Sequence, residues 1–150
     1  MEKNNKTLTV IKDALIAAVI GHAVALIILF LISTALAKNE DPSMLMPVGA
    51  LLAFFIGSLV CGTIAGKRID GPFGGAAAGG IYVLLLTAIS LLLDLFITDS
   101  GDAGTAYSFG FKIGMLLGAL MLSFLVGLWI NGRKNSKKSI AKHRKKAIGR

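Results

Sequence analysis

The sequence has few of the residues from which catalytic and metal sites are built. It contains one cysteine, Cys61, which excludes an internal disulfide, and two histidines, His22 and His143. No HExxH, CxxC or GxSxG pattern occurs, so the common spacings for zinc binding and nucleophilic catalysis are missing. Acidic residues number only eight. We therefore predict that the protein is not an enzyme and that it has no catalytic residue, no metal site and no cofactor.

Apolar residues are abundant instead, at 55% of 150 residues, with a mean hydropathy of +0.75. Soluble domains have a less apolar composition. Four runs without Asp, Glu, Lys or Arg are long enough to cross a hydrocarbon core, at residues 14–37, 44–66, 73–93 and 113–130. We predict an all-α fold, an integral membrane bundle of four transmembrane helices. These helices are expected at about residues 13–37, 44–66, 72–97 and 107–131, in a domain of residues 1–132.

The cations are placed asymmetrically along the chain. Of the sixteen Lys and Arg residues, all but Lys38 and Lys112 precede residue 13, lie between residues 66 and 72, or follow residue 132. The positive-inside rule therefore predicts that the N-terminus and the C-terminus are both cytoplasmic. A cleaved signal peptide is the rival interpretation, because Ala-Leu-Ala at residues 35–37 resembles a cleavage site. The preceding apolar run is too long for a signal peptide, so we favour a membrane span.

Small residues recur every four positions in three of the predicted spans. Such glycine-zipper spacing lets helix backbones approach closely in lipid, where apolar burial gives no preference for a protein neighbour. The helix-packing residues that we predict are Ser58, Gly62 and Gly66; Gly71, Gly75 and Gly79; and Gly110, Gly114 and Gly118.

Polar side chains are rare in the predicted spans, and five are candidates for a functional role. His22 is the one ionisable residue deep in a span, about 15 Å along the helix from Lys12. The others are Thr87, Ser90, Asp94 and Lys112.

Two interpretations of these five residues remain open. They line a polar pathway, with Asp94 and Lys112 paired at its outer mouth, or they make hydrogen bonds inside a packed bundle. We favour packing, because Thr and Ser can bond to carbonyls of their own helix and His22 can be a neutral packing residue with a partner such as Thr87 or Ser90.

Residues 133–150 form a basic tail without acidic residues, which we predict to be cytoplasmic. The tail should contact anionic lipid headgroups, since each Lys or Arg near an anionic leaflet contributes about 1 kcal/mol. We do not expect nucleic acid as a partner, because no aromatic residue is interleaved for base stacking. The lipid-contacting residues that we predict are Arg133, Lys134, Lys137, Lys138, Lys142, Arg144, Lys145, Lys146 and Arg150.

One segment carries a family resemblance. Residues 62–82 read GTIAGKRIDGPFGGAAAGGIY, in which a basic turn flanked by glycines precedes a glycine-rich helix start. With its four-span layout, the chain resembles the YrzE-type small four-helix membrane proteins of Gram-positive bacteria. The resemblance implies a four-helix fold in a bacterial plasma membrane, and it implies no activity.

The function that we predict is a noncatalytic structural or partner-binding component of a bacterial plasma (inner) membrane. Its expected partners are the lipid bilayer and either a second copy of the chain or another membrane protein. The alternative is a small transporter or channel that acts as an oligomer, with His22, Thr87, Ser90 and Asp94 near its path. A membrane-embedded enzyme ranks third.

Overall fold

The structure is a computed structural model. It describes the backbone of residues 2–37, 45–71, 73–97 and 109–148, and the side chains of residues 6–37, 48–71, 73–89 and 113–137. These backbone segments form four α-helices and no strand, which confirms the all-α prediction. The helices are α1 (Glu2–Leu36), α2 (Leu45–Arg68), α3 (Gly74–Ile97) and α4 (Phe109–Ile148).

Two helices are longer than predicted. α1 begins at Glu2 instead of near residue 13, and α4 continues to Ile148 instead of ending near residue 131. The predicted limits followed the apolar runs, whereas residues 2–13 and 131–148, into which α1 and α4 extend, contain no proline and many helix-forming Lys and Arg side chains. The helical backbone therefore continues through most of the basic tail.

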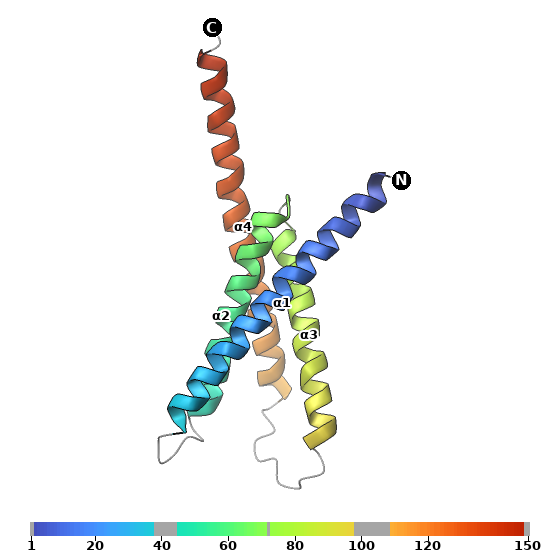
Figure 1. Ribbon diagram of the computed structural model, residues 1–150, viewed down its shortest axis with the longest axis vertical. Helices are drawn as coiled ribbons and strands as arrows, with labels where there is room; N and C mark the ends of the chain where they lie inside the picture. The colour runs from blue at the N-terminus through green and yellow to red at the C-terminus, as the bar shows by residue number, and fades with distance from the viewer. Residues whose placement is uncertain (1, 38–44, 72, 98–108, 149–150) are drawn as a thin grey trace.

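The helices pack as a central pair with one helix on each side. α2 and α3 run antiparallel in contact with each other, and α1 and α4 each contact both of them (Figure 1). No contact joins α1 to α4 among the described residues. α1 begins and α4 ends at the same end of the bundle, which we call the charged end because Asp13, Arg68, Asp70 and Lys134 lie there (Figure 1).

The core is built from small residues. Eight alanines, together with Ser58, Cys61 and Ser123, are buried, and Tyr82 is the largest fully buried side chain. Large apolar side chains such as Leu26 and Leu84 are exposed instead. This distribution is the reverse of a soluble core and suits a bundle surrounded by lipid, in which close packing through small residues joins the helices.

Three helices are long and apolar enough to cross a membrane, over Lys6–Leu36, Val48–Arg68 and Ile113–Lys137. The part of α3 with described side chains, Gly74–Ile89, is apolar but shorter than a span. The length and composition of three helices therefore agree with the predicted membrane protein.

Two of the predicted packing glycines have open space at the Cβ position among the described residues. Gly71 lies in the turn before α3 with φ of 127°, a conformation that favours glycine, and an added Cβ there would meet nothing within 4 Å. Gly114 is exposed, and its added Cβ would also meet none of the described residues within 4 Å. Neither glycine makes, among the described residues, the close backbone contact for which it was selected. The glycines of the turn precede the helix that starts at Gly74, and α4 turns a different face to its neighbours.

Candidate functional site

A close helix contact joins α2, α3 and α4 at Ser123. A Cβ added to Gly62 would lie 2.5 Å from the carbonyl oxygen of Ser123, and one added to Gly75 would lie 2.7 Å from the same atom. The Ser123 hydroxyl donates a hydrogen bond to the Gly75 carbonyl at 3.1 Å. The backbones of α2, α3 and α4 therefore meet at this point, and only glycine fits at position 62 of α2 and position 75 of α3.

Four further small residues extend this contact along the bundle. A Cβ on Gly66 would lie 2.9 Å from the Gly127 carbonyl oxygen, and one on Gly79 would lie 2.9 Å from the Ser123 Cβ. The buried Ser58 hydroxyl donates to the carbonyl of Ala119. We call Ser58, Gly62, Gly66, Gly75, Gly79, Ser123 and Gly127 the small-residue interior.

α4 contributes a face that the sequence analysis missed. Ala119, Ser123 and Gly127 are buried and spaced by four residues. The predicted series, Gly110, Gly114 and Gly118, has the same spacing but is shifted by one position along the helix. Gly118 lies at the edge of the contact, where its added Cβ would be 3.1 Å from the Phe55 ring. Gly110 lies outside the residues with described surroundings.

His22 points into the bundle from α1. Its Nδ1 lies 2.9 Å from the Ala18 carbonyl oxygen, and its ring centroid lies 4.2 Å from that of Tyr82 on α3. Its Nε2 is buried and has no hydrogen-bond partner among the described residues. The partner of His22 is thus its own helix, and the residue beside it is Tyr82, which the sequence analysis did not select.

Tyr82 connects α3 to α2 at the same level. Its hydroxyl donates to the Phe54 carbonyl oxygen at 3.0 Å, next to Gly57, where an added Cβ would lie 2.5 Å from the Tyr82 hydroxyl oxygen. Tyr82 was not selected from the sequence, because the packing candidates there were small residues at four-residue spacing. The hydrogen bond and the ring contact give it a structural role.

The other four candidate polar residues, on α3 and α4, are described only in part. Thr87 is half-buried, and its hydroxyl donates to the Val83 carbonyl oxygen of the same helix at 2.9 Å. This is the helix-internal bond that the packing interpretation expects. The side chains of Ser90, Asp94 and Lys112 lie outside the described residues, so the pairing of Asp94 with Lys112 stays a prediction.

Ion pairs tie the helices together at the charged end. Asp13 of α1 lies 3.5 Å from Arg68 of α2, and Lys134 of α4 lies 2.6 Å from Asp70 in the turn that follows α2. The Asn131 side-chain amide also donates to the Gly71 carbonyl. Side chains of α4 therefore bind the turn between α2 and α3, and a side chain of α1 binds the end of α2.

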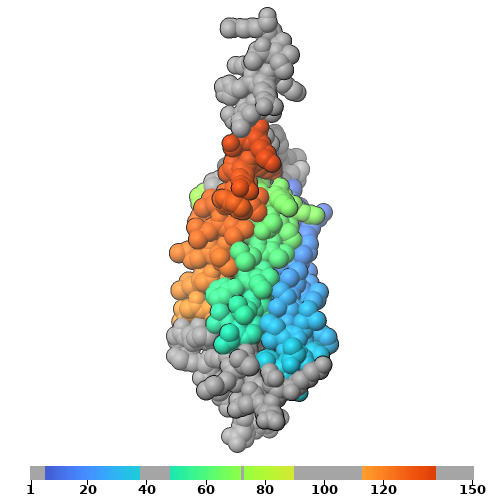
Figure 2. Space-filling view, turned by 90° about the vertical axis from the view of Figure 1, so that its left-hand side faces the viewer, coloured from blue at the N-terminus to red at the C-terminus, as the bar shows by residue number. Residues whose placement is uncertain are grey.

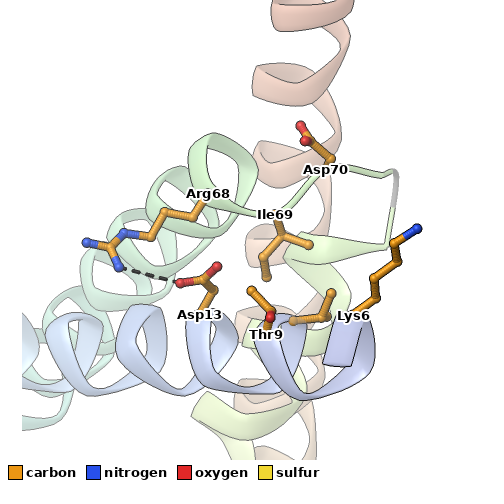
Figure 3. Close-up of a pocket in the computed structure, with 7 residues that line it drawn as sticks. Lys6, Thr9, Asp13, Arg68, Ile69 and Asp70 are labelled. Atoms are coloured by element: carbon orange, nitrogen blue, oxygen red, sulfur yellow. Dashed lines mark ion pairs between the residues drawn. The ribbon is translucent and has the colours of Figure 1, made fainter. Parts of the chain in front are cut away.

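An open cavity of about 500 Å³ lies between α1 and the end of α2 (Figure 3). Figure 3 shows Ile69 pointing from the turn towards α1, with the Asp13–Arg68 pair beside it and Lys6 and Asp70 pointing away from it. In this cavity the charges of Asp13 and Arg68 pair with each other, so neither is available to a ligand.

A second hollow, of about 290 Å³, lies between α2 and α4. Its lining is cationic, with Lys67 from α2 and Arg133, Lys134 and Lys137 from α4, and Ile130 as the apolar member. The Arg133 guanidinium carbon lies 4.2 Å from the centroid of the exposed Trp129 ring, a cation–π contact. This hollow can hold an anion.

No group of three or more His, Cys, Asp or Glu side chains that could hold a metal ion occurs in the part of the chain with described side chains. Cys61 is buried and unpaired in α2.

No protein-family model, curated protein or solved structure matches this chain.

Proposed function

We propose that the protein is a multi-pass integral membrane protein of a bacterial plasma membrane, in which it acts as a noncatalytic structural or partner-binding component. In this proposal all four helices cross the bilayer and both termini are cytoplasmic. The resemblance to the YrzE-type membrane proteins is part of the same proposal.

The observation that carries the proposal is the reversed distribution of side-chain size. Small residues form the contacts between helices, whereas large apolar side chains such as Leu26, Phe30 and Leu84 are exposed. Water around this surface would oppose folding, and lipid would not. The described cations Lys67, Arg68 and Lys134 gather where α1 begins and α4 ends, which supports placing that end in the cytoplasm.

Photo-crosslinking in the membrane tests the partner-binding role. A photoreactive amino acid at Leu26, Leu84 or Leu117 samples the exposed faces of α1, α3 and α4. We expect a protein adduct from one face and lipid adducts from the others. Lipid adducts from all three positions would contradict the partner-binding role.

A small oligomeric channel or transporter is the second candidate. The observation that favours it is the buried Nε2 of His22, which has no hydrogen-bond partner in the part of the chain with described side chains. A buried ring nitrogen near the middle of a span is suited to carry a proton. In proteoliposomes, such a protein should show a pH-dependent flux that His22→Gln abolishes while the thermal stability stays within a few degrees of wild type. The absence of flux in the wild type would eliminate this candidate.

A further inference from the structure

The hollow between α2 and α4 concentrates positive charge that the fold does not neutralise. Lys134 is bonded to Asp70 at 2.6 Å and to the Lys67 carbonyl oxygen at 3.2 Å. Among the described residues, no carboxylate lies within ion-pair distance of Lys67, Arg133 or Lys137. Three cations from two helices therefore face a space of about 290 Å³ without a counter-charge from the described residues.

The exposed face of α4 leads directly into this hollow. Leu117, Met121, Leu125 and Trp129 follow one another at four-residue spacing, with exposed fractions of 58, 60, 58 and 59%. Arg133 and Lys137 continue the same face. Figure 2 shows α4 (orange) beside α2 (green) along this side of the bundle. The face is aliphatic, then aromatic, then cationic.

A phospholipid has the same order of chemistry along its length. Its acyl chains are apolar, its glycerol region lies at the interface where Trp is enriched, and its phosphate is anionic. Arg133 is held over the Trp129 ring at 4.2 Å, so its planar donors are positioned before a ligand arrives. A guanidinium of this kind binds phosphate through two parallel hydrogen bonds.

We propose that this hollow binds the phosphate of an anionic glycerophospholipid whose acyl chains lie along the exposed face of α4. The inference rests on the proposed insertion of the protein in a membrane. A soluble phosphate would leave the adjoining apolar face unused, and a zwitterionic headgroup would bring a second cation to Lys67 and Lys137. The anionic lipid satisfies both the charge and the apolar face.

Trp129 is the only tryptophan of the chain and therefore reports on this site alone. The test uses the full chain in phosphatidylcholine vesicles at physiological ionic strength. A small fraction of the lipid is replaced by either phosphatidylglycerol or phosphatidylcholine with brominated acyl chains, which quench tryptophan fluorescence on contact. The ratio of the two quenching efficiencies measures headgroup selection and is independent of the quantum yield of Trp129.

The wild type should be quenched more by brominated phosphatidylglycerol, and Lys67→Gln/Arg133→Gln should lower this preference by about fivefold or more, because each cation near an anionic headgroup contributes about that factor. The matched control is Lys6→Gln/Lys12→Gln, which removes the same charge from the same end of the bundle on α1, across from α4. It should lower the preference less than about twofold. Lys137→Gln replaces one exposed cation of the hollow and leaves its other residues unchanged, so it repeats the test with a single substitution.

Each other outcome overturns the proposal in a different way. An equal loss in the test and control variants would mean that only diffuse charge attracts the lipid. Equal quenching by both brominated lipids in the wild type would mean that the hollow selects no headgroup, although the protein is inserted. Relief of quenching by millimolar inorganic phosphate would assign the hollow to a soluble anion. No quenching by either lipid would also contradict the proposed membrane insertion.

Discussion

The small-residue interior and the charged end hold the same helices together by different physical means. In the interior, α2, α3 and α4 approach until the backbones of Gly62 and Gly75 meet Ser123. At the charged end, the Asp13–Arg68 pair joins side chains that are partly exposed. Lipid offers no hydrophobic preference for a helix neighbour, so contact there depends on shape, whereas water screens the ion pairs at the end. Stability should therefore depend mainly on the interior.

The largest effect is expected from one added methyl group in the interior. Gly62→Ala would place a Cβ 2.5 Å from a backbone oxygen that cannot rotate away, and we expect a loss of about 3 kcal/mol, at the upper end for overpacking. Gly114→Ala is the matched control, because its Cβ would meet no described residue within 4 Å. Thermal unfolding in mild detergent measures both. Similar losses in the two variants would show that α4 does not pack through the Ser123 face.

A smaller effect is expected from the interhelical hydroxyl groups. Ser123→Ala removes the bond to the Gly75 carbonyl, and Ser58→Ala removes the bond to the Ala119 carbonyl. Each should cost about 1 kcal/mol, within the range for polar contacts between membrane helices. Thr87→Val serves as the control, since that hydroxyl bonds within its own helix. If Thr87→Val costs as much as Ser123→Ala, the interhelical bonds have no special weight.

The smallest effect is expected at the charged end. Asp13→Asn breaks the 3.5 Å pair with Arg68, whose side chain is 50% exposed, and should cost about 0.5 kcal/mol. The loss should disappear at 1 M salt, because the pair is screened, while the loss from Gly62→Ala should not change. A loss that persists in 1 M salt would mean that Asp13 acts through packing.

The number of helices and the limits of α2 and α3 could be predicted from the sequence because apolar length sets them. The start of α1 and the end of α4 could not, since the polar residues before the first apolar run and after the last one are also good helix formers. Hydrophobic length indicates where a helix enters lipid, and it does not indicate where the helical backbone stops.

The packing residues were predictable in type and only partly in identity. Gly62, Gly66, Gly75 and Gly79 lie where an added Cβ would meet a neighbouring helix. α4 carries two series of small residues one position apart, and spacing alone cannot tell which of them faces the bundle. Tyr82 was missed for a related reason: a large side chain is buried only because Gly21 and Gly57 leave room for it, and that requires knowledge of which helices are neighbours.

The orientation of the bundle in a membrane is the central claim, and cysteine labelling in intact cells tests it most directly. Replacing the single cysteine, Cys61, by alanine gives a background without thiols. In this background we expect a membrane-impermeant maleimide to label Asn39→Cys and Ser100→Cys in intact cells, and Asp70→Cys and Arg150→Cys only after permeabilisation. Labelling of Arg150→Cys in intact cells, or of all four positions alike, would contradict the account.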